Sequence, residues 1–486
     1  MKHIRRLAAV VLCLITMTCS AEPKTIEEAD ALELQGKFAE AATILSNTLA
    51  GTSLTTTERG QLEFELDRLT RIRMDYPLTK QQLFSALSDS VKDLTAAEFE
   101  QWISEGRFDS REIDGERRFM SSSVSNLYFR HTELETRRIK SKDTAAFEQA
   151  HLAACRAIRQ AALTERKPYV LPKRFRNTMT VTVKADATPA GAVIRAWLPI
   201  PRWYPFQTDF ELRASSPVAK EVNSRDSLIR SVHLEKPARK GKPTTFEIEY
   251  EYTAYGVHFN LQPEEVRPAE LNDPTLLPFL RETTHVRFTP EIRQLSREIV
   301  GDETNDLRKA KRCFDWIAGE IKYSFAIEYS TIRNISEYCL TKRYGDCGQE
   351  ALLFITLCRL NGIPARWQSG WNTFPGGKTI HDWCEIYLAP HGWMPVDPYM
   401  GIWATRYART LTPEEQREVR DFYFGGLDQW RMAANGDHCQ ELYPPKKSLR
   451  SDTVDFQRGE LEWGIHNLYF NQYDYELTVR EVKPPK

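Results

Sequence analysis

The spacing of hydrophobic residues changes along the 486-residue chain. From residue 25 to 167, apolar side chains recur every three to four positions, as on one face of a helix. Other segments alternate apolar and polar side chains, as in strands: residues 178–183, 193–198 and 246–252. We therefore expect a helical region over 20–170 and a β-sandwich domain over 173–260. Both patterns mix from about residue 275 onward, which predicts an α+β protein.

Residues 29–49 of the helical region resemble one tetratricopeptide unit, with Gly36 at the turn between two short helices. A repeat solenoid needs about three stacked units, and this region has one such match. An ordinary helical hairpin is the alternative interpretation.

The clearest local signal is a helix that begins at Cys347. Asp346 precedes it and Gln349 follows three positions later, which is the capping-box pattern. The apolar run ends at Asn361 and Gly362, a typical helix stop. Cys347 therefore lies in the first turn, where the positive end of the helix dipole favours a thiolate and where free amides can stabilise an oxyanion.

Strands are predicted after this helix over 365–371, 382–388 and 393–397. His381 opens the second of these strands and Asp397 closes the third, so we expect their side chains near the same end of a hairpin. An Asp beside an imidazole orients the ring and stabilises its charged form. His381 could then accept the thiol proton of Cys347 and later protonate a leaving amine.

Taken alone, Cys347, His381 and Asp397 have ordinary interpretations as a buried thiol, a strand-edge residue and a turn residue. Their ordered combination is similar to the transglutaminase-like superfamily. The matching segments are Tyr-Gly-Asp-Cys at 344–347, Asn-Gly-Ile-Pro-Ala-Arg at 361–366, His-Asp-Trp at 381–383 and Gly-Trp-Met-Pro-Val-Asp-Pro at 392–398.

This resemblance implies a papain- or transglutaminase-like core over 275–405, in which a helix packs on an antiparallel sheet and Cys347, His381 and Asp397 form a catalytic triad. From about residue 170 the chain resembles exported bacterial transglutaminase-like proteins described as cysteine proteases. The phrase at 196–201, Ala-Trp-Leu-Pro-Ile-Pro, looks like the β-domain that precedes the core in many of these relatives.

Gly348 and Tyr323 are the two positions where the match to the family is less direct. Gly348 follows the nucleophile, where animal transglutaminases have Trp, although bacterial relatives vary there. The family also uses an aromatic or amide side chain upstream of the nucleophile as a second oxyanion donor, and Tyr323 is the candidate for this role. The alternative is that Tyr323 is a core aromatic residue at a helix end.

The two ends of the chain give further expectations. Basic residues at 2–6, an apolar run over 7–17 and Cys19 predict a signal peptide over 1–19 with lipid attached to Cys19. Simple cleavage near Ala21 is the alternative. We expect an exported cell-envelope protein, lipid-anchored in the outer membrane or facing the periplasm. Residues 406–486 predict a C-terminal helix and a β-hairpin extension.

The amino-acid composition limits which partners and ligands are expected. Lys and Arg total 66 against 67 Asp and Glu, so there is no electrostatic basis for binding nucleic acid. Of nine cysteines, Cys13 and Cys19 fall in the signal peptide. The remaining odd number suits one free reactive thiol, with the pairing of the others open. The sequence has no Cys-x-x-Cys and no closely spaced His pair, so we expect no metal site, and no cofactor is implied.

These observations predict an enzyme that cleaves or transfers amide or peptide bonds through a Cys347 thioester. Hydrolysis is favoured, because an amine competes with water only in a dry amine-binding channel. The expected substrate is a peptide or protein, with peptidoglycan peptides as one candidate. A protein-crosslinking transglutaminase and a surface-binding protein with an idle core are the alternatives.

Overall fold

The computed structural model describes residues 24–51, 53–140 and 143–483. These residues fall into two compact units. The first contains the chain up to Arg73 together with Arg111–Arg117, and the second contains Met74–Ser110 and the chain from Arg118 onward. The predicted signal peptide, with Cys13 and Cys19, lies outside the described residues.

The first unit is helical. Its helices are α1 (Lys24–Leu34), α2 (Phe38–Leu49) and most of α3 (Thr56–Asp75). Gly36 makes the turn between α1 and α2 with φ at +76°, and a Cβ there would lie 2.9 Å from Glu112. The turn therefore requires glycine. Helix α3 contributes buried Arg68, whose guanidinium binds Glu33 at 2.5 Å and Glu65 at 2.7 Å.

A β-hairpin interrupts the helical region that was expected to run over 20–170. It consists of β1 (Ser110–Ile113) and β2 (Glu116–Phe119). The turn residues Asp114 and Gly115 both have positive φ, 51° and 83°, as a two-residue hairpin turn of type I′ requires. The turn residues at 113–116, Ile-Asp-Gly-Glu, predict this small hairpin within the helical region, whereas no local pattern predicts the division into two units.

The helices of the second unit that come before the β-sandwich precede or follow this hairpin in the sequence. They are α4 (Lys80–Ser88), α5 (Ala96–Ser104), α6 (Ser123–Arg130), the 3₁₀-helix η1 (Thr132–Arg137) and α7 (Ala145–Glu165). Helix α6 packs against the α+β core, where Asn126 exchanges hydrogen bonds with the backbone of Phe325 at 2.8 and 3.1 Å.

The second unit also contains a β-sandwich made of two five-stranded sheets. One sheet has the order β14-β8-β3-β18, with β5 paired to β8; the other has the order β17-β16-β4-β7-β6. The strands of the first sheet are β3 (Tyr169–Val183), β5 (Gln207–Ser216), β8 (Thr244–His258), β14 (Gly426–Leu427) and β18 (Tyr473–Val482). The strands of the second sheet are β4 (Val193–Pro199), β6 (Glu221–Val222), β7 (Ser231–Pro237), β16 (Glu460–Trp463) and β17 (His466–Leu468).

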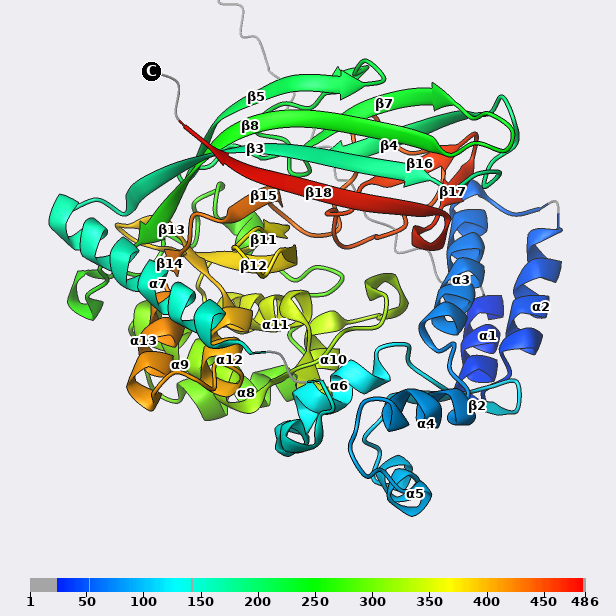
Figure 1. Ribbon diagram of the computed structural model, residues 1–486, viewed down its shortest axis with the longest axis horizontal. Coiled ribbons are helices and arrows are strands. Elements are labelled where there is room, and N and C mark those ends of the chain that lie inside the picture. Colours follow the sequence, from blue (N-terminus) through cyan, green and yellow to red (C-terminus); the bar gives the residue numbers. More distant parts are fainter. Residues whose placement is uncertain (1–23, 52, 141–142, 484–486) are drawn as a thin grey trace, which may run out of the picture. The chain divides into compact units, whose positions relative to one another are not determined.

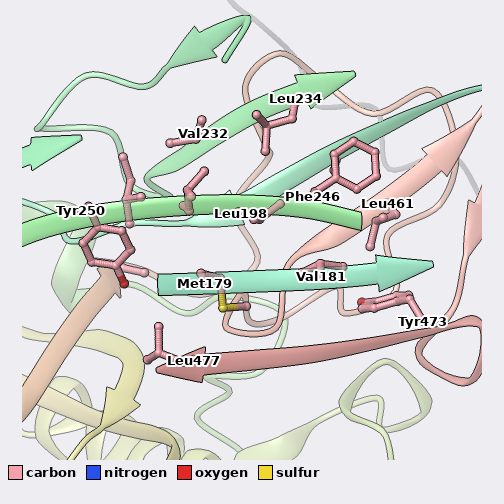
Figure 2. Close-up of a cluster of buried hydrophobic side chains, with 14 of the residues drawn as sticks. Met179, Val181, Leu198, Val232, Leu234, Phe246, Tyr250, Leu461, Tyr473 and Leu477 are labelled. Carbon is pink, nitrogen blue, oxygen red and sulfur yellow. The ribbon is translucent and has the colours of Figure 1, made fainter. Parts of the chain in front are cut away.

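Apolar side chains from both sheets fill the space between them (Figure 2). Alternate residues of β3, such as Met179 and Val181, face inward because side chains alternate along a strand. The C-terminal strands complete this core, since Leu461, Tyr473 and Leu477 are at most 2% exposed.

The C-terminal segment 406–486 does contain a β-hairpin, since β16 pairs with β17, and its strands belong to the sheets of the β-sandwich. Strand β18 pairs with β3 along its whole length, from Tyr473 opposite Val183 to Val482 opposite Arg174, whereas β16 pairs with β4 in the other sheet (Figure 1). Periodicity identifies a strand but not its neighbour, which is set by the sheet edges that remain unpaired in three dimensions.

The α+β core has a four-stranded antiparallel sheet in the order β13-β12-β11-β15. Its strands are β11 (Ala365–Asn372), β12 (Thr379–Leu388), β13 (Gly392–Val396) and β15 (Arg431–Asn435), and a parallel pair is formed by β9 (Lys322–Tyr323) and β10 (Tyr344–Gly345). The helices are α8 (Pro290–Val300), α9 (Asp306–Glu320), α10 (Ile335–Lys342), α11 (Cys347–Leu360), α12 (Pro398–Arg406) and α13 (Pro413–Phe422). The remaining 3₁₀-helices are η2 (Pro263–Glu265), η3 (Leu277–Leu280), η4 (Tyr329–Thr331) and η5 (Phe470–Gln472).

Helix α11 is the buried centre of this core and packs on β11 and β12 (Figure 1). Its residues from Gly348 to Arg359 are all buried. It begins at Cys347 as the capping box predicted, and Gly362, with φ at +78°, follows its end. The predicted α+β architecture, with a helix on an antiparallel sheet, is confirmed.

Candidate active site

The N-terminus of α11 places Cys347 as its first residue. The Asp346 side chain accepts a hydrogen bond from the Gln349 amide at 3.1 Å, and Gln349 Oε1 accepts one from the Asp346 amide at 3.3 Å. These reciprocal bonds determine where the helix begins. The Cys347 amide makes no hydrogen bond within the described part of the chain, so it is available to a substrate oxygen.

The residue after the nucleophile is glycine for a packing reason. A Cβ on Gly348 would lie 2.1 Å from Tyr329 Oη and 2.8 Å from both Asp382 Oδ2 and the Trp367 ring. Tyr329 Oη is itself held by donating to Asp346 Oδ1 at 2.5 Å. Tyr329 and Trp367 thus fill the space that a larger side chain at this position would need.

The parallel pair β9–β10 brings Tyr323 beside the segment that precedes Cys347, because Tyr323 and Gly345 are register partners. Tyr323 and Cys347 line the same cavity. Burial raises the pKa of Tyr323, so its hydroxyl stays protonated, and it makes no hydrogen bond within the described residues. The candidate oxyanion donor therefore lies at the nucleophile with a proton to donate.

His381 and Asp397 meet as the hairpin β12–β13 predicted. His381 Nε2 lies 2.8 Å from Asp397 Oδ2, and both side chains are almost completely buried. Asp397 also caps α12, because its Oδ1 accepts from the Met400 amide at 3.0 Å. One carboxylate thus orients the imidazole and begins the next helix.

Arg431 of β15 completes this arrangement. Its Nη1 lies 2.8 Å from Asp397 Oδ2, and its Nη2 lies 3.0 Å from Asp428 Oδ2. Burial by itself would raise the pKa of Asp397, but His381 and Arg431 outweigh it and lower that pKa. Burial lowers the pKa of His381 despite Asp397, so the imidazole is neutral near pH 7 and can accept a proton.

The thiol of Cys347 has a different partner in this structure. Cys347 Sγ lies 3.4 Å from Asp382 Oδ2, and no hydrogen bond joins it to His381 among the described residues. Because side chains alternate along β12, Asp382 faces away from the Asp397 side that His381 faces. The structure therefore brings His381 and Asp397 together, while Cys347 rests on the neighbouring residue of the same strand.

A loop between β15 and β16 holds Asp382 in place. Gln457 Nε2 donates to Asp382 Oδ1 at 2.7 Å and to the His381 carbonyl at 3.0 Å. Burial and the adjacent Asp455 raise the pKa of Asp382, and the two carboxyl groups share a hydrogen bond. Asp455 is anchored in turn by Asn435 Nδ2 at 3.0 Å.

These surroundings change the expected charge of the nucleophile. Burial raises the pKa of Cys347, and Asp382 and Asp346 raise it further. The positive end of the α11 dipole, worth up to about 2 kcal/mol, is therefore outweighed. The resting sulfur is a neutral thiol, which differs from the thiolate expected from helix geometry alone.

Cys347 opens into a cavity of about 290 Å³. Its walls come from η4 and its flanks, from the start of α11, from β12 and from the 452–458 loop. The lining residues are Asp75, Tyr323, Phe325, Ala326, Ile327, Glu328, Tyr329, Asp346, Cys347, Thr379, Ile380, Asp382, Asp452, Asp455, Gln457 and Arg458. The other described cysteines are Cys155, Cys313, Cys339, Cys358, Cys384 and Cys439; all are free thiols, and all but Cys439 are buried.

Sequence reasoning missed Arg431, Asp455 and Gln457. All three follow the predicted core, in a segment assigned to an extension. They stand in no short motif, and a single Arg or Asp in a strand or loop is most often a solvated surface residue. Their role becomes visible only from the buried charges that they contact.

Residues 293–398 match the family model of the transglutaminase-like superfamily. This segment contains α11, strands β11 to β13 and all three residues of the candidate triad. The chain therefore contains a transglutaminase-like core.

Two curated proteins are similar over part of their length. An uncharacterized protein of Haemophilus influenzae is 24% identical over 193 residues, which cover 34% of this chain and 52% of that protein. YebA, an uncharacterized protein of Bacillus subtilis, is 25% identical over 130 residues, which cover 23% of this chain and 18% of that protein. The matches thus span about half of one relative and less of the other.

Solved structures give a broader and weaker likeness. A provisionally named cysteine protease from Cytophaga hutchinsonii has a TM-score of 0.40 and 18% identity, covering 65% of this chain and 93% of that one. The periplasmic domain of TgpA from Pseudomonas aeruginosa has a TM-score of 0.26 and 14% identity, covering 56% of this chain and 96% of that one. Among the helices of residues 24–483 that the structure describes, none has the length and apolar character of a membrane span.

The packing around Gly348 leads to a stability prediction. Gly348→Ala should lower the free energy of unfolding by roughly 1–3 kcal/mol, as overpacking of a filled site does, because the new methyl group overlaps Tyr329 Oη. Urea unfolding followed by circular dichroism measures this loss.

The matched control is Gly319→Ala in α9, where a Cβ would meet nothing within 4 Å. This variant should keep or slightly raise stability, because Ala favours a helix over Gly. Adding Tyr329→Phe to Gly348→Ala should recover part of the loss. Equal stability of the two alanine variants would contradict the packing argument.

Proposed function

We propose that this protein is a cysteine hydrolase that cleaves amide or peptide bonds through a thioester on Cys347. The observation that carries the proposal is the buried His381–Asp397 hydrogen bond of 2.8 Å, in the same transglutaminase-like core whose helix N-terminus presents Cys347 to a cavity. A buried acid–imidazole pair and a thiol at a helix N-terminus, in one core, are the groups that nucleophilic catalysis through cysteine requires.

Acylation would proceed in the usual order for a thiol enzyme. His381 takes the Cys347 proton, and the sulfur attacks the substrate carbonyl carbon. The Cys347 amide and the Tyr323 hydroxyl donate to the oxyanion that forms on the carbonyl oxygen. When the C–N bond breaks, His381 returns the proton to the departing amine, which leaves an S-acyl enzyme.

Deacylation would use the same imidazole. His381 removes a proton from a water molecule, and the resulting hydroxide attacks the thioester carbonyl. The C–S bond then breaks, releasing a carboxylic acid, and the sulfur regains a proton from His381. Asp397 and Arg431 keep the ring in place through both steps, since neither residue changes its charge.

The first step requires the thiol to leave Asp382. In the resting geometry Cys347 Sγ lies 3.4 Å from Asp382 Oδ2. We infer that substrate entry rearranges the start of α11 and β12 so that the sulfur reaches His381, because Asp382 and His381 face opposite sides of β12 in the resting structure. Catalytic hydrogen bonds are often absent in ligand-free enzymes and form only in the substrate complex.

Water is the preferred acyl acceptor in this proposal. The cavity beside Cys347 is lined by several carboxyl groups, including Asp346, Asp382 and Asp455. A wall of this polarity holds water, whereas transfer to an amine needs a dry channel. Protein crosslinking is therefore the second outcome to be tested, and a peptide or protein, including a peptidoglycan peptide, is the proposed substrate class.

A peptide-library assay tests the proposed reaction. Cys347→Ala should reduce hydrolysis at least about 10³-fold, because the nucleophile is lost. Cys439→Ala is the matched control: Cys439 is the other partly exposed cysteine, and its loss should leave turnover intact. Mass spectrometry with an added fluorescent amine separates hydrolysed from amine-conjugated products. Equal turnover by Cys347→Ala and wild type would eliminate this mechanism.

Replacing Asp382 should change the titration of the nucleophile. In the alkaline range where the thiol ionises, a carboxylate at Asp382 opposes the thiolate, and it is among the causes of the raised pKa of Cys347. Asp382→Asn removes this negative charge, so the pKa falls and alkylation of Cys347 reaches half its maximal rate at a lower pH.

Iodoacetamide labelling with peptide mapping across pH measures this shift. Asp315→Asn, a change on the exposed face of α9, should leave the profile in place. A profile that stays fixed or moves to higher pH in Asp382→Asn would show that Asp382 does not act on the thiol.

We also propose that the protein is exported and anchored by lipid on Cys19. The warrant is the order of basic residues at 2–6, apolar residues at 7–17 and then cysteine. In cell fractionation, wild-type protein should sediment with membranes and Cys19→Ala should not. Wild-type protein that begins after Ala21 and stays out of the membrane fraction would instead indicate simple cleavage.

A further inference from the structure

A second cavity of about 590 Å³ lies in the β-sandwich and shares no lining residue with the cavity at Cys347. It begins where the phrase at 196–201 ends, so Arg202 and Trp203 form part of its wall. Arg225 and Arg230 approach from the segment between β6 and β7. Three guanidinium groups therefore surround one hollow.

Arg230 is the most unusual of these groups. It is 7% exposed, and its guanidinium lies over the Phe210 ring at 4.3 Å. Its Nε and Nη1 donate to the carbonyls of Asn223 and Pro201 at 3.2 and 2.5 Å. Its Nη2 makes no hydrogen bond within the described residues. Buried arginines are normally paired with a carboxylate, but no ion pair of Arg230 occurs in the described part of the chain.

The neighbouring groups offset this charge only in part, since Asp226 acts on Arg230 without forming an ion pair with it within the described residues. Arg202 is also without an ion pair among the described residues, and it donates to the carbonyls of Ser227 and Asp226 at 2.5 and 3.3 Å. Asp209 is the carboxylate on the cavity wall, but it accepts from Thr208 Oγ1 at 2.9 Å and pairs with none of the three arginines within the described residues. Burial and the nearby Arg202 lower the pKa of Arg230 to about 10.

The rim adds an apolar surface and one more cation. Trp203 is 44% exposed, and the Arg225 guanidinium lies 5.4 Å from its ring centroid. Arg225 pairs only loosely with Asp226, at 3.6 Å, and both side chains are exposed. A ligand on this wall can place an apolar ring against Trp203 while its charged end meets Arg225 and Arg230.

We propose that this cavity, formed by Arg202, Trp203, Arg225 and Arg230, binds an organic oxyanion, a carboxylate or phosphate carried on an apolar ring. An oxyanion can accept a hydrogen bond from Nη2 of Arg230. Its negative charge compensates the positive charge of the arginines around the cavity. The site is independent of the reaction at Cys347, and its occupancy does not require catalysis.

Two small probes distinguish the oxyanion chemistries: phenyl phosphate and benzoate. Isothermal titration calorimetry at low ionic strength should show saturable binding of at least one of them to the full chain. The preferred probe identifies a phosphate or a carboxylate ligand. Arg230→Gln should weaken binding about tenfold or more, since a charge-assisted hydrogen bond is lost, and added NaCl should weaken it further.

Arg225→Gln is a second test of the proposed binding site, for the case that Arg230→Gln impairs folding. Arg225 is an exposed residue at the rim of the cavity, so its replacement should not affect folding. It should weaken binding several-fold at an unchanged melting temperature. Arg308→Gln, an exposed arginine of α9, is the control and should bind like wild type. No saturable binding of either probe to the wild type, or equal affinity in Arg225→Gln and wild type, would overturn the proposal.

Discussion

The buried carboxylate of Asp397 is the constraint on which the catalytic core depends. It is 0% exposed, yet it binds His381 and Arg431 at 2.8 Å each and caps α12. A buried charge of this kind is tolerated only when its partners are in place. Arg431 therefore helps to hold Asp397, and through it His381, in place, and Asp428 holds Arg431 in turn.

This requirement explains why the core extends beyond the region that matches the superfamily. Arg431 lies on β15, which pairs with β11 at the edge of the sheet and packs into the sandwich core through Met432 and Ala434. The next loop returns to β12 with Asp455 and Gln457. The β-sandwich and the catalytic sheet are thus joined by the strand that balances the charge of Asp397.

Opposing fields act on the nucleophile. The N-terminus of α11 favours a thiolate, whereas burial and the carboxyl groups of Asp346 and Asp382 favour the thiol. In the ligand-free structure, burial and the two carboxyl groups outweigh the helix N-terminus, so the pKa of Cys347 is raised. Such a site holds the sulfur in its less reactive, protonated form.

Much of the site was predictable because its signals are local. A capping box occupies four consecutive residues, so Asp346 and Gln349 identified the start of α11 and placed Cys347 in its first turn. The strand patterns after it placed His381 and Asp397 near one end of a hairpin, and the structure puts them in contact. The α+β fold class followed from the change of hydrophobic period along the chain.

What only the tertiary structure decided is which distant groups meet. The sequence predicted strands within residues 406–486, but the neighbours of a strand depend on free sheet edges, and β16 and β18 joined different sheets of the sandwich. The need for Gly348 came from Tyr329 and Trp367. The sequence by itself determined helix starts, strand periods and the order of thiol, imidazole and carboxylate, since these are properties of neighbouring residues. Charge compensation and side-chain direction are properties of the folded core, so the partners of Asp397 and of the Cys347 thiol appear only there.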